Sequence, residues 1–176
     1  MALNLADYVA SIPNYPIQGV LFRDVTPMME NAEAFAESIE QLAKISEDLN
    51  VDLVAGPESR GFIFGAPLAL KLGVGFVAVR KPGKLPRETI SCKYDLEYGS
   101  AELFMNKDAI KPGQRVLILD DLLATGGTGK AVANMVEQLG GVVAGFVFVI
   151  ELEGLPGRKI LDGYEVRALM EMPDSE

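Results

Sequence analysis

Short apolar runs, most of them rich in β-branched residues and bounded by Gly or Pro, alternate along this chain with patterns typical of helices. The apolar runs cover residues 51–55, 75–79, 116–119 and 142–150, and the helical patterns cover residues 62–72 and 128–139. Runs of this length and composition are typical of strands buried on both faces. Strand, helix and strand in this order form right-handed βαβ units. The sequence therefore predicts an α/β fold with a central parallel sheet flanked by helices.

Two further segments add to this core. After a short N-terminal helix and a turn containing Pro13 and Pro16, Asn31 is a predicted N-cap. The helix that follows has apolar residues every three or four positions, at Phe35, Ile39, Leu42, Ile45 and Leu49. Later in the chain, residues 89–94 and 101–105 are the predicted arms of an antiparallel hairpin with its tip at residues 95–100. A hairpin inserted between parallel strands predicts a flap.

Length and composition limit the classes of protein to which the chain can belong. Its 176 residues, 49% of them hydrophobic, suffice for one closed core, so we expect a single domain over residues 1–176. The net charge of −9 argues against nucleic acid or an anionic membrane as a partner. There is one cysteine, Cys92, no secretion signal at the N-terminus, and no apolar run long enough to span a membrane. We therefore expect a cytoplasmic protein.

The chain contains no histidine. Imidazole is the usual proton shuttle near neutral pH, so any acid–base chemistry must use a carboxylate, a lysine or a tyrosine. Serine–histidine and cysteine–histidine nucleophile pairs are excluded, as are zinc sites with histidine ligands.

The sequence VLILDDLLATGGTGK, residues 116–130, predicts a phosphate site. A buried strand is expected to end at Asp120 and Asp121, and a loop then opens a helix at the carboxyl edge of the sheet, where α/β proteins bind ligands. Gly126 and Gly127 permit positive φ angles and close backbone approach, and the helix N-terminus favours an anion. We expect a monophosphate to be bound by Ala124, Thr125, Gly126, Gly127 and Thr128.

Asp120 and Asp121 would repel a phosphate and need another role. Carboxylates accept hydrogen bonds, which suits the two vicinal hydroxyls of a ribose. At a strand end both side chains can reach the crevice, so the pair beside the loop predicts a ribose 5-phosphate site. Two other interpretations are a simple loop cap and the Walker B strand of a P-loop NTPase. The second requires GxxxxGK[ST] elsewhere, and the nearest string has Ala124 and Ala131 at two required positions.

The strand, acidic pair and ATGGT loop resemble the phosphoribosyl pyrophosphate signature of the type I phosphoribosyltransferases. The resemblance covers nearly the whole chain and is strongest to the members that use adenine. It extends through GVLFRDVTP (19–27), ESRGF (58–62), VRKPGKLP (79–86), YDLEYGSAEL (94–103) and IELEGLPG (150–157). It implies the type I phosphoribosyltransferase fold, with a small base-binding hood over about residues 1–30 and the flap over about residues 89–106.

The resemblance also implies roles for two groups near the predicted sheet edge. Ser59, Arg60 and Gly61 match the family's pyrophosphate loop, at a second predicted helix N-terminus. The basic residues Arg80, Lys81 and Lys84 would add positive potential for the same group, within one subunit or across the interface of an implied homodimer. Taken singly, Arg60 can equally pair with a surface carboxylate, and a basic cluster is usually a solvated face. Pro57 departs from the family pattern and puts the local loop geometry in doubt.

For the base, the resemblance points to the flap and the hood. Glu97 matches the carboxylate that handles the purine ring proton, and Tyr98 lies beside it at the flap tip. A glutamate at a hairpin tip is otherwise normally solvated. Phe22 would stack on the adenine ring, with Leu152 on its other face, while main-chain groups of Leu21 and Arg23 recognise its edge.

The implied reaction joins adenine to the phosphoribosyl group of phosphoribosyl pyrophosphate, giving AMP and pyrophosphate, with Mg²⁺ held mainly by the substrate. Two alternatives remain. One is another base, namely hypoxanthine, guanine, xanthine or uracil, because the base contacts are largely main chain. The other is a non-catalytic regulator that senses phosphoribosyl pyrophosphate, although the chain lacks a basic DNA-binding segment.

Overall fold

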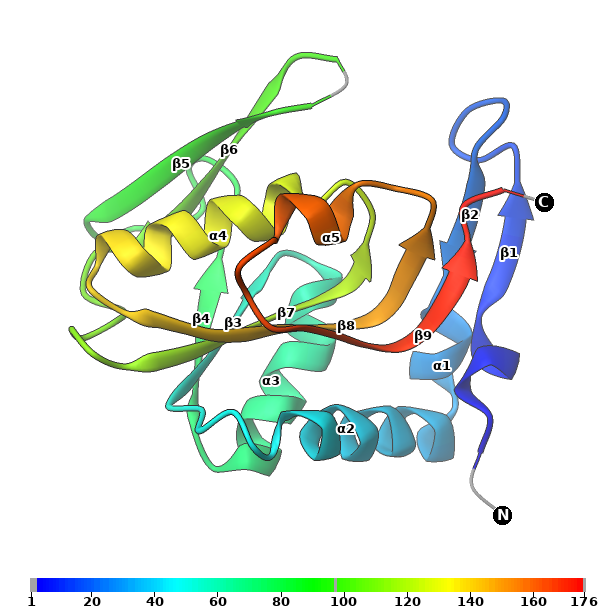
Figure 1. The fold of residues 1–176 in the computed structure, drawn as a ribbon, viewed down its shortest axis with the longest axis horizontal. Coiled ribbons are helices and arrows are strands. Elements are labelled where there is room, and N and C mark those ends of the chain that lie inside the picture. The colour runs from blue at the N-terminus through cyan, green and yellow to red at the C-terminus, as the bar shows by residue number, and fades with distance from the viewer. Residues whose placement is uncertain (1–2, 97, 176) are drawn as a thin grey trace.

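A parallel sheet forms the centre of the molecule in the computed structural model, which describes residues 3–96 and 98–175 (Figure 1). Within these residues the sheet has five strands in the order β4-β3-β7-β8-β9. All neighbouring strands in it run parallel. The strands are β3 (Leu53–Pro57), β4 (Gly75–Val79), β7 (Arg115–Leu123), β8 (Val142–Glu153) and β9 (Val166–Pro173). The predicted α/β class with a parallel sheet is confirmed.

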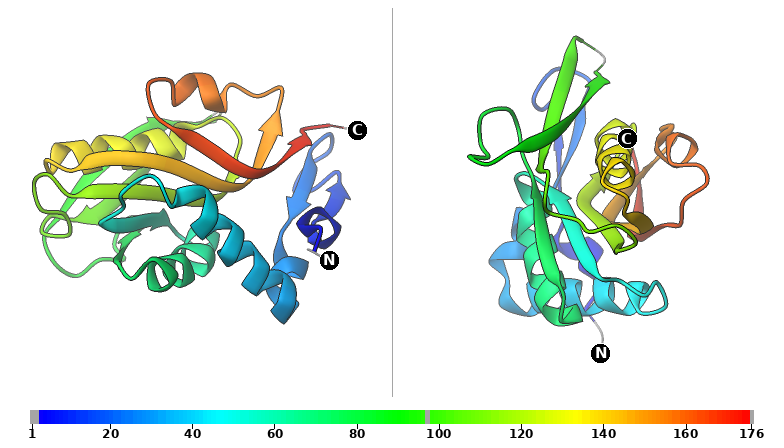
Figure 2. Two further views of the ribbon diagram at one scale, coloured as in Figure 1. Left: turned by 60° about the horizontal axis from the view of Figure 1, so that its bottom comes forward. Right: turned by 90° about the vertical axis from the view of Figure 1, so that its left-hand side faces the viewer.

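Helices cover both faces of this sheet (Figures 1 and 2). One face carries α2 (Ala32–Ser46) and α3 (Arg60–Leu72), together with α1 (Thr26–Glu30) and the 3-10 turn η1 (Leu5–Tyr8). The other face carries α4 (Gly127–Gln138) and α5 (Gly157–Ile160). The predicted N-cap is confirmed, because the Asn31 side chain accepts a hydrogen bond of 2.9 Å from the Ala34 amide. Among the described residues, no helix combines the length and apolar character needed to cross a membrane.

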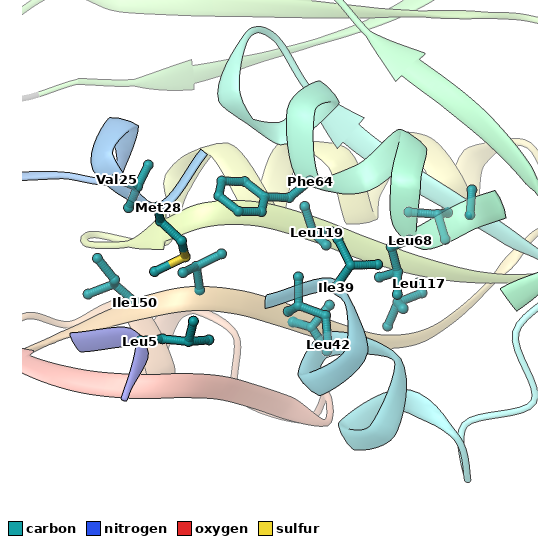
Figure 3. Close-up of a cluster of buried hydrophobic side chains, with 14 of the residues drawn as sticks. Leu5, Val25, Met28, Ile39, Leu42, Phe64, Leu68, Leu117, Leu119 and Ile150 are labelled. Carbon is teal, nitrogen blue, oxygen red and sulfur yellow. The ribbon is translucent and has the colours of Figure 1, made fainter. Parts of the chain in front are cut away.

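Over residues 3–96 and 98–175 the core consists of two apolar clusters, one on each face of the sheet. Side chains alternate along β7, so Leu117 and Leu119 face α2 and α3 whereas Val116 and Ile118 face α4. Figure 3 shows the first cluster, in which Leu42 of α2 and Phe64 of α3 pack on the sheet. Burial of apolar area on both faces holds the strands' carboxyl edge in place, and the site is built on this edge.

In the described part of the chain, two antiparallel hairpins lie outside the central sheet. β1 (Ala10–Pro13) pairs with β2 (Leu21–Asp24), and β5 (Thr89–Asp95) pairs with β6 (Ser100–Asn106). The second hairpin, residues 89–106, is the predicted flap. In Figure 1 the flap lies above α4, and the β1–β2 hairpin stands beyond β9. Both hairpins extend to the side of the sheet where the carboxyl ends of the strands lie.

Three strands of the central sheet end later than predicted, namely β3, β7 and β8, the last of which continues to Glu153 instead of ending at residue 150. β7 does not end at Asp120 and Asp121 but continues to Leu123, because the apolar residues after the acidic pair remain in register with β8. β3 ends two residues later than predicted, at Pro57, which pairs with Val79 of β4. Pairing of β3 with β7 ends at Ala55, so Pro57 lies beyond that ladder, where its missing amide donor is tolerated.

Candidate active site

The loop between β7 and α4 encloses a small hollow of about 80 Å³ at the carboxyl edge of the sheet. All five residues predicted to bind a phosphate line it, together with Asp120, Leu122, Leu123, Gly129 and Phe148. α4 begins at Gly127, so the free amides of its first turn lie at this hollow. The positive end of the helix dipole therefore favours an anion there.

Glycine is required at two positions that hold this loop in place. Gly126 has a φ of 86°, whereas Gly127, for which a positive φ was also expected, is helical. Gly157 begins α5 and packs against the loop from outside: a Cβ on it would lie 2.6 Å from the carbonyl oxygen of Ala124. The sequence analysis did not identify Gly157, which stands in the quoted motif LPG but lies more than 30 residues from the loop.

Asp120 and Asp121 have different surroundings. Asp120 lines the hollow, and its Oδ1 accepts a hydrogen bond of 2.9 Å from the Asp121 amide. Burial, and then the neighbouring Asp121 carboxylate, raise the pKa of Asp120 well above its usual range. Asp121 is buried and ion-paired with Arg60. Both carboxylates were expected to reach into one crevice; Asp120 lines the hollow, whereas Asp121 has Arg60 as a cationic partner.

The predicted pyrophosphate loop joins β3 to α3. Ser59 precedes the helix, Arg60 and Gly61 are its first two residues, and Gly61 is buried. The preceding residue, Glu58, was not predicted to have a role. Its Oε1 accepts hydrogen bonds from the Lys81 amide at 2.8 Å and from Arg80 Nε at 3.1 Å. The Lys81 amide, together with Arg80, lowers the pKa of Glu58, and the contact fastens the basic segment to the pyrophosphate loop.

The basic segment follows β4. Its first residue, Arg80, also exchanges two backbone hydrogen bonds with Phe104 of β6, at 2.9 and 2.8 Å. Arg80 therefore connects the sheet edge, the pyrophosphate loop and the flap. Lys81 and Lys84 are exposed, with ammonium groups that are available to an anionic ligand. The structure thus places Arg80 beside Glu58, while the two lysines extend into solvent.

A second hollow, of about 320 Å³, lies between the β1–β2 hairpin and α3. The ring of Phe22 lines it, in edge contact with Tyr15 at a centroid distance of 5.2 Å, and the Arg60 guanidinium carbon lies 5.9 Å from the Phe22 centroid. The remaining lining residues are Ile12, Asp24 and Thr26. The Asp24 carboxylate accepts a hydrogen bond of 2.9 Å from the Thr26 amide and one of 2.8 Å from the Thr26 hydroxyl. The sequence analysis predicted Phe22 and Arg60 but missed Tyr15 and Asp24.

Leu21, Arg23, Leu152 and Tyr98, the other described residues predicted for the base site, are not part of the lining of this hollow. Leu21 and Arg23 flank Phe22 in β2, so their side chains point to the opposite face of the strand. The Arg23 guanidinium donates to the Pro173 carbonyl at 2.7 Å and thereby ties the hairpin to the end of β9. Leu152 is half-buried against the α2–α3 core cluster. Tyr98 is 85% exposed at the flap tip, and Glu97 lies outside the described residues.

Comparison with known proteins agrees with this geometry. A family model described as the phosphoribosyl transferase domain matches residues 27–167. Adenine phosphoribosyltransferases of Streptococcus thermophilus and Streptococcus uberis are each 55% identical over 171 residues, which is 97% of this chain and 99% of theirs. A crystal structure of adenine phosphoribosyltransferase from Thermoanaerobacter pseudethanolicus is 54% identical, with a TM-score of 0.94 over 96% of this chain and 100% of its own.

A further structure is that of the Saccharomyces cerevisiae adenine phosphoribosyltransferase in complex with adenine and an imino-altritol bisphosphate. It is 42% identical, with a TM-score of 0.88 over 94% of this chain and 96% of its own. Such identity over nearly the full length of both chains shows the family. The chain belongs to the adenine phosphoribosyltransferases of the type I phosphoribosyltransferase family.

Proposed function

We propose that the adenine phosphoribosyltransferase reaction of this chain takes place across the carboxyl edge of the sheet, between the loop hollow and the hollow beside Phe22. In this reaction of purine salvage, adenine and phosphoribosyl pyrophosphate give AMP and pyrophosphate. The observation that carries the proposal is the position of Arg60. It lines the hollow beside Phe22 and is paired with Asp121, the neighbour in β7 of Asp120, which lines the loop hollow. Arg60 therefore links residues at the edges of both hollows.

The 5-phosphate would occupy the hollow of residues 124–128. Amides of the first turn of α4 and the hydroxyls of Thr125 and Thr128 supply its hydrogen-bond donors. Hydrogen bonds to a charged group contribute about 1.5–3 kcal/mol each, so four or five suffice to anchor the substrate. The glycines Gly126 and Gly127 leave room for the phosphate to approach the backbone.

The ribose hydroxyls would lie on the carboxylates of Asp120 and Asp121. As C1 loses pyrophosphate it develops positive charge, and carboxylates fixed beside it stabilise that charge without reorganising. The raised pKa of Asp120 fits this role, because added positive charge nearby restores its ionised form. Arg60 would turn from Asp121 toward the pyrophosphate when the substrate binds.

The pyrophosphate would be held by Ser59, Arg60 and Gly61, with Arg80, Lys81 and Lys84 beside them. Cations at these positions offset the charge that grows on the leaving group. Glu58 keeps the backbone of Lys81 next to the loop, which supports delivery of the lysine side chains to this end of the substrate.

Adenine would lie against Phe22, with Tyr15 bracing the ring and main-chain groups of Leu21 and Arg23 recognising its edge. N9 then attacks C1 from the face opposite to the departing pyrophosphate. Glu97 would take the ring proton, and the flap with Tyr98 at its tip would exclude water from the cationic intermediate. Leu152 would cover the other face of the ring.

Magnesium would reside mainly on the substrate. Among the described residues, no group of three or more acidic, cysteine or histidine side chains is close enough to hold an ion. Asp120 and Asp121 form an acidic pair at the proposed sugar position and would help to hold the ion beside the substrate. When bound, the ion would neutralise charge on the leaving group.

We further propose a homodimer and a cytoplasmic location. Exposed apolar side chains on the outer face of α3, Leu70 at 82% and Ile63 at 38%, support burial of that face against a second copy. A phosphorylated substrate of this charge does not cross membranes unaided, which supports a cytoplasmic enzyme. Light scattering of the purified chain measures its oligomeric state directly.

A panel of bases tests the function. The enzyme is incubated with phosphoribosyl pyrophosphate, magnesium and one of adenine, hypoxanthine, guanine, xanthine or uracil, and nucleotide products are separated by chromatography. The proposal predicts AMP from adenine and no nucleotide from the other bases. Formation of another nucleotide at a similar rate would contradict the assignment of the base site.

A further inference from the structure

One face of β5 lies along α4, so the flap is supported by the helix that begins at the phosphate loop (Figure 2). Ile90, Cys92 and Tyr94 alternate with exposed residues and point inward. The Cys92 sulfur accepts a hydrogen bond from Asn134 Nδ2 of α4 at 3.9 Å. Tyr94 is the last inward-facing residue before the flap tip.

Tyr94 makes two contacts with the first turn of α4. The Thr128 hydroxyl donates a hydrogen bond of 3.2 Å to the Tyr94 hydroxyl. In addition, a Cβ placed on Gly127 would lie 3.3 Å from Cδ2 of the Tyr94 ring, so the ring packs directly over that glycine. Both partners belong to the five residues proposed to bind the 5-phosphate, whereas Tyr94 itself does not line the hollow.

The hydrogen bond between the two hydroxyls can reverse. Each hydroxyl has one proton to donate and two lone pairs that accept, and the proton rotates to suit its partners. With a phosphate in the hollow, the strongest acceptor near Thr128 is a phosphate oxygen, so the Thr128 proton turns to it. The freed lone pair of Thr128 Oγ1 then accepts the Tyr94 proton. A chain from Tyr94 to Thr128 to phosphate results, in which each hydrogen bond polarises the next.

We propose that Tyr94 is a positioning residue of the 5-phosphate site, which couples the phosphate to the flap through the hydroxyl of Thr128. The inference rests on the proposed function, because it requires the phosphate to bind in the hollow of residues 124–128. Its consequence is that the sugar phosphate, once bound, strengthens the contact that holds the flap arm against α4.

Binding of ribose 5-phosphate, followed by calorimetry, tests this relay. Tyr94→Phe keeps the ring over Gly127 and removes only the hydroxyl. We expect it to weaken the binding of ribose 5-phosphate by about 3- to 10-fold, which is the range for one neutral hydrogen bond. The binding of inorganic pyrophosphate should not change. Tyr164→Phe is the matched control, because it removes a tyrosine hydroxyl that donates a hydrogen bond of 2.5 Å to Glu137. It should change the affinity for neither ligand.

A double-mutant cycle with Thr128→Val separates the inference from the proposed function. Thr128→Val should itself weaken the binding of ribose 5-phosphate. In a protein that already carries Thr128→Val, adding Tyr94→Phe should have no further effect on this binding, since the relay is already broken. If Thr128→Val weakens binding but Tyr94→Phe does not, the relay is refuted while the phosphate site stands. If neither variant changes ribose 5-phosphate binding, the phosphate site itself is refuted. Equal weakening of both ligands by Tyr94→Phe would show a general structural defect and overturn the relay.

The chain contains no tryptophan, so Leu96→Trp at the flap supplies a single fluorescent reporter of its position. Ribose 5-phosphate should change the emission of this variant. Adding Tyr94→Phe should raise the concentration for half of that change by about 3- to 10-fold. If the concentration of ribose 5-phosphate for half of the emission change is the same with and without the Tyr94 hydroxyl, the coupling is overturned.

Discussion

Arg60 is ion-paired with Asp121, and the pair joins the first turn of α3 to β7 at the edge of the sheet. The Asp121 side chain is 7% exposed, whereas that of Arg60 is 44% exposed. The carboxylate is therefore buried with one cationic partner that solvent still reaches. Such a pair can hold the edge together and can also open when a substrate with more negative charge arrives.

Removal of the Arg60 side chain should lower the free energy of unfolding by more than the loss of an ordinary surface ion pair does. Arg60→Ala leaves the buried Asp121 carboxylate unpaired, which we expect to lower the free energy of unfolding by about 2–3 kcal/mol, less than for a fully buried pair because Arg60 is half exposed. Arg87→Ala is the control, since Arg87 and Asp108 form an exposed pair at 3.3 Å. Urea denaturation measures both, and equal stability of the two variants would contradict a structural role for Arg60.

Asp120→Asn should make the protein more stable and less active. Burial raises the pKa of Asp120, so the folded state binds a proton that the unfolded state has lost, and this carboxylate costs stability as pH rises from about 3.9 through the raised value. The neutral amide of the variant has no such cost, and its oxygen still accepts the hydrogen bond from the Asp121 amide. We expect a melting temperature at pH 7 higher by roughly 2–4 °C, with little difference near pH 4.

Turnover of the same variant should fall by roughly 100-fold, as for other losses of a group that stabilises transition-state charge. Steady-state rates with saturating adenine and phosphoribosyl pyrophosphate give this comparison. A variant that melts at the wild-type temperature across the pH range, or retains near-full turnover, would show that Asp120 is not a strained carboxylate of the ribose site.

Gly157→Ala should disturb the phosphate loop from outside. Its Cβ would lie 2.6 Å from the Ala124 carbonyl oxygen and 2.7 Å from Leu123 Cδ1, so the loop must move. We expect KM for phosphoribosyl pyrophosphate to rise roughly 10-fold or more, because donors displaced by a few tenths of an ångström lose much of their hydrogen bonding. Gly163→Ala, at a positive φ of 89° in open space, should lower stability by about 1 kcal/mol without changing this KM.

Magnesium should bind with the substrate rather than to the free protein. A chelator is then expected to abolish turnover but to leave the melting temperature of the enzyme alone unchanged. With phosphoribosyl pyrophosphate present, magnesium should raise the melting temperature, since a ligand that binds only the folded state stabilises it by mass action. A rise produced by magnesium alone would indicate a site made by the protein itself.

Much of the central sheet is predictable from local sequence. β4 is predicted at its observed bounds because a glycine begins it and a basic, proline-containing segment ends it. β9 was missed, since Arg167 and Glu171 interrupt the apolar pattern of this edge strand. β1 and β2 were missed as strands because they are only four residues long and Pro13 ends the first of them. Edge strands and short hairpins depend on tertiary partners that local patterns do not contain.

The residues of the site also fall into those that local sequence identifies and those that it does not. Residues of the phosphate loop could be identified because one contiguous segment carries strand, glycines and helix start. The partners of that loop are distant in sequence: Asp121 pairs with Arg60, Thr128 contacts Tyr94, and Gly157 packs on Ala124. The error at Asp120 and Asp121 has a physical cause too, because two acidic residues normally end an apolar strand, whereas pairing of Leu122 and Leu123 with β8 carries this one further.

A crystal structure of the enzyme with AMP is the most direct test of where the sugar phosphate binds. We predict the phosphate of AMP in the hollow of residues 124–128, the ribose hydroxyls on Asp120 and Asp121, and the adenine ring against Phe22. A phosphate found outside that hollow, or an adenine ring away from Phe22, would contradict the account of this site.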